Sequence, residues 1–286
     1  MSATLLDGAA TAAQIREGLK PRVQRLRDVG VVPKLSVVII GDDPASHTYV
    51  RMKAKACRGV GIESETYTLP HNATQCEAEE VIDHLNVDDS VHGILLQHPV
   101  PKHLDEIRLL NQLSPDKDVD GISPASLGAL VAGVAKFIAC TPLGIVELLD
   151  RYTIPLEGKR AVVVGRSIIL GKPLALLLLQ RHATVTVCHT RTRDLPSVTR
   201  EAEILVAACG RAELITGDMI RPGAVVVDAG YNRVEGRSGD VGDVHFESAS
   251  QVASYITPVP GGVGPMTIAM LLSNTVRAAE MRLEMR

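Results

Sequence analysis

The chain has few aromatic side chains and no excess of positive charge. Its 286 residues contain no Trp, two Phe and five Tyr, and 30 Lys and Arg stand against 33 Asp and Glu, a formal net charge of −3. Proteins that bind duplex nucleic acid by charge present clustered basic residues, and those that bind single strands stack bases on aromatic rings. Both absences argue against nucleic acid as a partner.

Long apolar runs and paired cysteines are also missing. The longest obvious uninterrupted apolar run, 174–179, falls far short of the roughly 18–20 residues of a membrane span. The first 16 residues carry Asp7 and no basic stretch before the apolar residues, unlike a targeting peptide. Five scattered cysteines without a CxxC argue against a disulfide framework or a zinc knuckle. We therefore expect a cytoplasmic protein with no membrane contact that acts on small molecules.

Short β-branched segments alternate with helical patterns along the chain, which predicts βαβ units and parallel sheets. The predicted strands are 35–41, 63–69, 91–97, 160–165, 184–188, 203–208 and 224–228. The predicted helices are 46–58, 74–85, 104–113, 141–152 and 171–181, with Thr141 as a helix cap. A second unit starts near residue 140, and the helical pattern at 264–286 is long enough to leave it and pack on the first.

A glycine-containing loop follows the 160–165 strand. Gly165, Arg166 and Ser167 come directly after the strand, and Gly171 and Pro173 begin the next helix. Glycines allow a phosphate to approach the backbone, and the helix N-terminus favours an anion. The spacing meets the GxGxxG fingerprint only loosely, so a turn without a ligand remains an alternative.

The end of the next strand indicates the type of dinucleotide. An acidic residue there would bind a ribose 2′-hydroxyl, and a basic one would accept a 2′-phosphate. The strand 184–188 is followed by Thr190 and Arg191, with no carboxylate before Asp194. Together with Arg166, this favours NADP over NAD, although the arginines alone could be a solvated surface.

Polar groups in the first unit could meet beyond the carboxyl ends of its strands, where open α/β sheets bind ligands. Tyr49 and Lys53 lie four residues apart on one predicted helix, and Gln97 ends a predicted strand. Asp118 and Asp120 follow the 104–113 helix. A lysine buried in a cleft can exchange protons because burial lowers its pKa. Spacing alone would favour an ordinary amphipathic helix with an exposed lysine.

The motifs together resemble the bifunctional methylenetetrahydrofolate dehydrogenase/cyclohydrolase family over nearly the whole chain. The matching stretches are Leu6-Asp-Gly8, 41–46, Tyr49-Val-x-x-Lys53, 93–101, 115–121, Cys140-Thr-Pro142, 164–167, 171–173 and the run Pro258-Val-Pro-Gly-Gly-Val-Gly-Pro-Met-Thr267. Tyr49-Val-x-x-Lys53 and the run that ends at Thr267 are highly specific in combination.

The resemblance implies two α/β domains with parallel sheets and a cleft between them. Residues 1–139 and a C-terminal helix, 265–286, would form a folate-binding catalytic domain, and 140–264 a Rossmann-like NADP-binding domain. NADP would oxidise 5,10-methylenetetrahydrofolate to the methenyl form, and hydrolysis would give 10-formyltetrahydrofolate. The resemblance also suggests a homodimer through the second unit. The nine histidines show no HExxH or other ligand spacing, so no metal is expected.

The resemblance assigns roles to individual residues. Lys53 is the central group of the hydrolysis, Gln97 tunes it, Tyr49 shapes the folate site and Asp120 holds the pterin. Gly264 and Thr267 are expected at the folate pocket. The loop 165–173 would carry the pyrophosphate, with Arg166, Thr190 and Arg191 near the 2′-phosphate.

A few positions depart from the family pattern: Ile122, Leu170, Ala229, Tyr231 and His245. Ala229, Tyr231 and His245 lie in the second unit and leave the details of cofactor contact open. A dehydrogenase with one activity, for which Lys53 would be a bystander, and a nucleotide-binding sensor without catalysis remain the alternatives.

Overall fold

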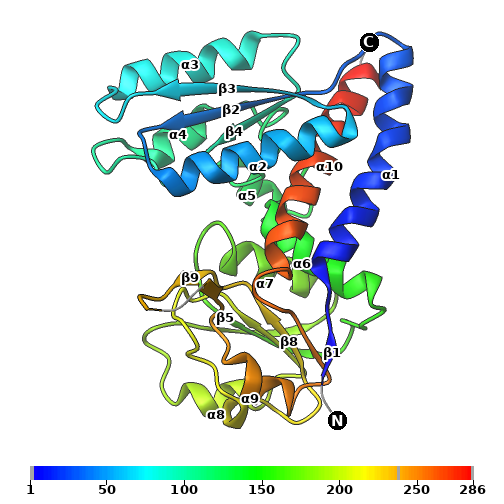
Figure 1. Ribbon diagram of the computed structural model, residues 1–286, viewed down its shortest axis with the longest axis vertical. Coiled ribbons are helices and arrows are strands. Elements are labelled where there is room, and N and C mark those ends of the chain that lie inside the picture. Colours follow the sequence, from blue (N-terminus) through cyan, green and yellow to red (C-terminus); the bar gives the residue numbers. More distant parts are fainter. Residues whose placement is uncertain (1–2, 237–238, 285–286) are drawn as a thin grey trace. The chain divides into compact units, whose positions relative to one another are not determined.

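The computed structural model describes residues 3–236 and 239–284, and it divides the chain into two compact units (Figure 1). The first unit comprises Gln14–Cys140 together with the residues from Ile268 onward. The second unit comprises residues up to Ala13 together with Thr141–Thr267. Each has its own parallel sheet, so the predicted fold class of two α/β domains is confirmed.

The first unit corresponds to the predicted catalytic domain, and its sheet has the strand order β3-β2-β4. Its strands are β2 (Lys34–Ile40), β3 (Glu63–Leu69) and β4 (Gly93–Leu96). α2 (Pro44–Val60) and α3 (Gln75–Val87) lie on opposite faces of this sheet (Figure 1). β2 is buried along nearly its whole length because helices cover both of its faces.

The helices of this unit have defined ends. Asp43 caps α2 by accepting the Ser46 N–H at 2.8 Å, and Gly61 ends the helix in the left-handed region at φ 86°. Thr74 and Glu77 form a capping box at α3. α4 (Glu106–Gln112) and α5 (Pro124–Val131) follow β4. α4 packs with α3 on one apolar cluster that includes Ile82, Ile94 and Leu109.

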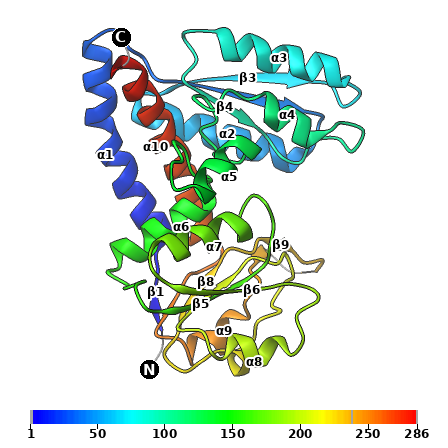
Figure 2. The ribbon, with the colours of Figure 1, turned by 180° about the vertical axis from the view of Figure 1, so that it is seen from behind.

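The second unit holds a larger sheet of order β1-β11-β8-β7-β5-β6, in which every described pair is parallel. Its main strands are β5 (Arg160–Val164), β6 (Thr184–Cys188), β7 (Ile204–Ala207) and β8 (Val225–Asp228). α7 (Gly171–Gln180) lies on one face, and α8 (Leu195–Thr199) and α9 (Phe246–Ser250) lie on the other (Figure 2). The short elements η1 (Gly217–Met219), β9 (Asn232–Arg233) and β10 (Asp240–Val241) complete this unit.

The predicted domain limits need correction at the chain's beginning. Residues up to Ala13 belong to the second unit because β1 (Thr4–Leu5) pairs with β11 (Tyr255–Ile256). A side chain at Gly8 would also collide with the Gly262 carbonyl, 1.8 Å from its Cβ position, so the two segments are in close contact. α1 (Gly8–Asp28) continues from this segment into the first unit. The division after Cys140 lies within one residue of the expected boundary.

The C-terminal helix α10 (Val263–Glu284) likewise begins in the second unit and joins the first from Ile268. Within the first unit, Asn274 donates to the Val119 carbonyl at 2.8 Å and Arg22 forms an ion pair with Glu280. The expected Thr141 cap is wrong. α6 (Cys140–Arg151) begins one residue earlier, and the Thr141 hydroxyl instead accepts a hydrogen bond from Thr267 at 3.0 Å. Among the described residues, no helix combines the length and apolar character needed to cross a membrane.

Candidate active site

Lys53 and Gln97 are brought together at the carboxyl end of β4. The Lys53 Nζ donates to the Gln97 Oε1 at 2.9 Å, although 44 residues separate the two in sequence. Gln97 is 8 % exposed, and its Nε2 donates to the His98 carbonyl at 2.7 Å. Because a carbonyl only accepts, this second bond requires the amide nitrogen on its side and places the amide oxygen toward Lys53.

The lysine is electrostatically perturbed. Burial lowers the pKa of the Lys53 ammonium, and the nearby Asp120 carboxylate opposes this effect. Burial also raises the pKa of Asp120, an effect that the Lys53 charge counters. The Cys140 thiol adjoins both groups, and burial raises its pKa well above the usual value, so it stays neutral. The site therefore contains an amine able to gain and lose a proton closer to neutral pH than an exposed lysine.

The two aspartates of the 116–121 segment have different surroundings. Asp118 is fully buried and accepts hydrogen bonds from the Gly121 and Ser123 N–H groups, each at 3.0 Å, and from the Ser126 hydroxyl. Its oxygens are occupied in holding the turn. Asp120 is the carboxylate that acts on Lys53, so the structure separates a structural aspartate from a candidate site residue.

Tyr49 lies one helical turn before Lys53 on α2, and its side chain is 37 % exposed. Sequence reasoning did not single out His98, the next residue after Gln97. A protonated ring at His98 lowers the pKa of Asp120, and the same ring contacts the Glu106 carboxylate. The sequence signal that could have identified His98 is its position directly after the predicted site residue Gln97. Gly264 and Thr267, expected at the folate pocket, belong to the other unit, where they begin α10.

The predicted phosphate loop lies at the carboxyl end of β5. Gly165 has φ 134°, and a Cβ there would stand 2.0 Å from the Ala208 carbonyl oxygen, so only glycine fits. At Gly171 a Cβ would stand 2.3 Å from the Gly165 carbonyl oxygen, which keeps the loop compact. Arg166 and Ser167 are exposed beside it. The residues present fit a phosphate that approaches the backbone closely.

One detail of this loop differs from the expectation. The first two N–H groups of α7 are bonded to Ser167: Gly171 N–H to the hydroxyl at 3.3 Å, and Lys172 N–H to the carbonyl at 3.0 Å. Pro173, at the third helical position, has no N–H to offer. A phosphate would thus contact the loop before α7 more readily than the first turn of the helix.

The turn after β6 presents Thr190 and Arg191 at its exposed tip. The His189 N–H donates to the Thr192 hydroxyl at 2.8 Å, and the Arg191 N–H donates to the His189 Nδ1 at 3.0 Å. Asp194, the first carboxylate after β6, caps α8 by accepting the Ser197 N–H at 3.3 Å. That carboxylate is already engaged at the helix end, which leaves guanidinium and hydroxyl groups at the turn.

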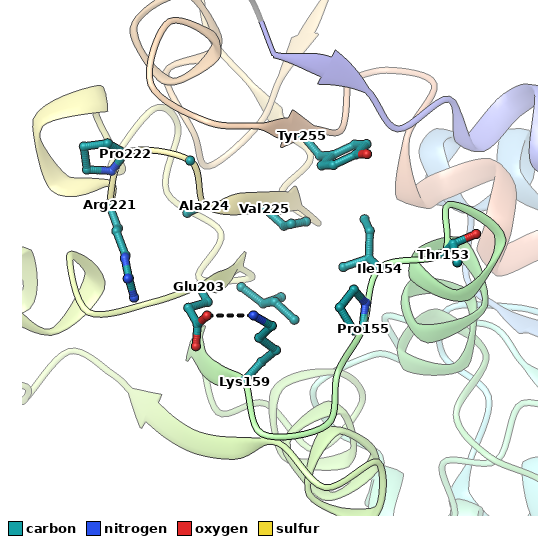
Figure 3. Close-up of a pocket in the computed structure, with 12 residues that line it drawn as sticks. Thr153, Ile154, Pro155, Lys159, Glu203, Arg221, Pro222, Ala224, Val225 and Tyr255 are labelled. Carbon is teal, nitrogen blue, oxygen red and sulfur yellow. Dashed lines mark hydrogen bonds and ion pairs between the residues drawn. The ribbon is translucent and has the colours of Figure 1, made fainter.

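A cavity of about 310 Å³ in the same unit lies at the opposite, amino-terminal edge of the sheet (Figure 3). Lys159 and Glu203 form an ion pair across it at 2.9 Å, and Arg221 and Tyr255 line its sides. The predicted cofactor residues follow the carboxyl ends of the strands. This cavity is therefore separate from the predicted dinucleotide site.

These features define a class: a two-domain α/β protein in which one unit is suited to bind a dinucleotide and the other carries a half-buried lysine whose pKa is lowered. Two family models match the chain, the tetrahydrofolate dehydrogenase/cyclohydrolase catalytic domain over residues 6–120 and the NAD(P)-binding domain of the same proteins over residues 139–283. The chain belongs to the tetrahydrofolate dehydrogenase/cyclohydrolase family, which confirms the resemblance seen in its motifs.

Individual relatives agree with this assignment. The bifunctional protein FolD of Moorella thermoacetica is 57 % identical over 279 residues, which cover 98 % of this chain and 99 % of the relative. The crystal structure of the bifunctional FolD of Campylobacter jejuni matches with a TM-score of 0.96 and 51 % identity over 98 % of this chain and all of that one. A Trypanosoma brucei FolD structure, complexed with NADP and an inhibitor, matches with a TM-score of 0.95 and 38 % identity over 99 % of each chain.

The Lys53–Gln97 contact yields a direct electrostatic prediction. In the Gln97→Glu variant a carboxylate replaces the amide oxygen beside the amine, so the pKa of Lys53 should rise by roughly one unit or more. The measurement is an NMR titration of protein labelled with 13C at the lysine Cε, with the Lys53 signal assigned by its loss in Lys53→Met. Asn111→Asp, which adds the same charge at an exposed position on α4, is the control. An unchanged Lys53 midpoint in Gln97→Glu would contradict the described contact.

Proposed function

We propose that this chain catalyses two consecutive reactions on one-carbon folates. The first is the NADP-dependent oxidation of 5,10-methylenetetrahydrofolate to 5,10-methenyltetrahydrofolate, and the second is hydrolysis of that product to 10-formyltetrahydrofolate. Family membership supports both activities, and the partly buried Lys53–Gln97 hydrogen bond is the observation that carries the second. A dehydrogenase with one activity, or a nucleotide sensor, would have no use for a desolvated amine fixed by an amide.

Proton transfer is the central requirement of the hydrolysis. The methenyl carbon is already an electrophile, so water adds to it and must then lose a proton. The neutral Lys53 amine can accept that proton and return it to N5 as the carbon–N5 bond breaks, while the second hydrogen of the water leaves as a proton to solvent and the formyl group stays on N10. Because Gln97 accepts one N–H of the amine, it restricts the directions in which the lone pair of the neutral amine can point. Asp120 tunes the amine by its charge, and we assign it to the pterin as well.

The oxidation requires positioning more than acid–base chemistry. NADP, when bound, supplies the nicotinamide carbon that accepts the hydride. We assign its phosphates to the loop Gly165–Pro173, including Arg166, Ser167 and Gly171, and its 2′-phosphate to Thr190, Arg191 and Arg166. The exposed guanidinium groups and the engagement of Asp194 at α8 support NADP over NAD. Tyr49, Gly264 and Thr267 are assigned to the folate.

The two activities should separate in a Lys53 variant. Lys53→Met should reduce methenyl hydrolysis at least about 100-fold, the usual contribution of a positioned acid–base group, and should reduce NADPH formation less than about tenfold. NADPH formation and the decay of methenyl absorbance are followed in the same coupled assay. Lys55→Met, an exposed lysine on the same helix, should leave both rates unchanged. Undiminished hydrolysis in Lys53→Met would refute the role assigned to this amine.

The 2′-phosphate assignment predicts a change of cofactor preference. Arg166→Ala combined with Arg191→Ala should raise the KM for NADP on the order of tenfold and leave the KM for NAD nearly unchanged, because only NADP carries the extra phosphate. Arg160→Ala, an exposed arginine at the opposite end of β5, is the matched control. Equal losses for both cofactors would show that these arginines do not bind the 2′-phosphate.

We also propose a cytoplasmic homodimer that associates through the dinucleotide-binding unit. The unpaired state of the five cysteines is consistent with a reducing compartment. β6 lies at one edge of the larger sheet, and its Val187 is 39 % exposed. An edge strand with an exposed apolar side chain is a surface on which a second copy can pair.

Sedimentation analysis tests the dimer. The wild-type chain should sediment as a dimer, and Val187→Lys should shift the equilibrium toward monomer at least about tenfold because it places a charge on the edge. Val134→Lys, at an exposed position of the other unit, should sediment like the wild type. A Val187→Lys protein that dimerises as tightly as the wild type would rule out this edge.

A further inference from the structure

Two buried carboxylates lie at the carboxyl-terminal edge of the larger sheet, and neither was assigned a role above. Asp228 is the last residue of β8 and is 3 % exposed, and Asp243, just beyond β10, is fully buried. Burial raises the pKa of Asp228 to about 6. A carboxylate is expensive to bury unless it is well hydrogen-bonded, so the partners of each indicate its purpose.

Asp243 holds the loop that follows β7. Its Oδ2 accepts the N–H groups of Cys209 at 2.6 Å and Gly210 at 3.0 Å. Its Oδ1 accepts the Arg211 N–H at 2.8 Å and the Asn232 Nδ2 at 2.9 Å. Three successive backbone N–H groups are thus directed onto one side chain, which fixes the course of residues 209–211.

Asp228 in turn holds Asp243. The Asp228 carboxylate accepts the Asp243 and Val244 N–H groups, each at 2.9 Å, and the Gly230 N–H at 2.9 Å. Glycine is required at position 242, because a Cβ there would stand 1.8 Å from the Asp228 Oδ2. The two carboxylates therefore connect the end of β8 to the loop after β7 through the segment 242–244.

The loop after β7 borders the predicted dinucleotide site. The Ala208 carbonyl lies 2.0 Å from where a Gly165 Cβ would stand, and the Ala208 N–H donates to Val164 at 2.8 Å. β5 has β6 on one side and β7 on the other. If the adenosine 2′-phosphate lies at the β5–β6 edge, by Arg166 and Arg191, the rest of the dinucleotide must extend across β5 toward the β7 loop.

We propose that Asp243, supported by Asp228 and Asn232, is a positioning residue that shapes residues 209–211 to receive the nicotinamide-side half of the dinucleotide. It acts through the backbone of this loop and touches no reacting atom. The inference rests on the proposed dinucleotide site, and it predicts a loss confined to one half of the cofactor.

Asp243→Asn tests the inference. Whichever way the new amide turns, its NH2 group faces two N–H donors, so two of the four accepted hydrogen bonds are lost. The KM and Kd for NADP should rise on the order of tenfold. Adenosine 2′,5′-bisphosphate, a probe that lacks the nicotinamide half, should bind as it does to the wild type. Hydrolysis of added methenyltetrahydrofolate, which needs no dinucleotide, should keep its kcat and KM and report that the protein is folded.

Two further variants complete the design. Glu203→Gln is the matched control, since this carboxylate also accepts a backbone N–H, that of Arg160, at 3.1 Å, but lies at the opposite edge of the sheet. It should leave NADP binding unchanged. Asn232→Ala removes one side-chain donor to Asp243 and should raise the NADP KM two- to fivefold. This milder variant tests the inference if Asp243→Asn does not fold.

The outcomes are distinguishable. Wild-type protein that neither binds nor uses NADP would overturn the proposed function. Wild-type protein that uses NADP, with an unchanged KM in Asp243→Asn, would overturn this inference alone. Equal weakening of NADP and adenosine 2′,5′-bisphosphate would also overturn it, because the loop would then not be specific to the nicotinamide side.

Discussion

The hydrogen bond between Lys53 and Gln97 is the interaction on which the chemistry proposed for the first unit depends. An amine buried without a partner would lose solvation with no compensation, and an amine paired closely with a carboxylate would be held in its charged form. A neutral amide avoids both results, since it accepts an N–H and adds no charge. The backbone carbonyl of His98 fixes that amide, so the position of the amine is set by the end of β4.

Buried carboxylates organise the loops in both units. Asp118 holds the 118–126 turn from which Asp120 projects, and Asp228 and Asp243 hold the loops at the carboxyl edge of the larger sheet. In each case backbone N–H groups satisfy most of the oxygens, so the charge is compensated without a cation. Loops at the ends of parallel strands lack the backbone hydrogen bonds that hold the strands together. A buried carboxylate that accepts several backbone N–H groups fixes such a loop instead.

The sequence predicted β3 and β6 residue for residue, although both are edge strands and largely exposed, because Thr, Val and Tyr in these segments favour extended backbone. α1 was missed, since its alanine- and arginine-rich segment shows only weak periodicity, and the two-residue strands β1 and β11 carry no pattern of their own. Their pairing, which moves the N-terminal residues to the second unit, is a long-range effect. Spacing placed Lys53 and Gln97 in one site, but only the hydrogen bonds distinguish Asp118 from Asp120.

The division of labour between the two units follows from what each reaction requires. Hydrolysis needs a poised amine, and the groups that perturb Lys53 all belong to the first unit. Oxidation needs in addition a dinucleotide, whose predicted contacts all belong to the second. A change in the loops of the second unit would therefore alter the proposed dinucleotide contacts without changing the groups that perturb Lys53. The charges that perturb Lys53 and those that hold the loop after β7 thus belong to different units, so each set can change without the other.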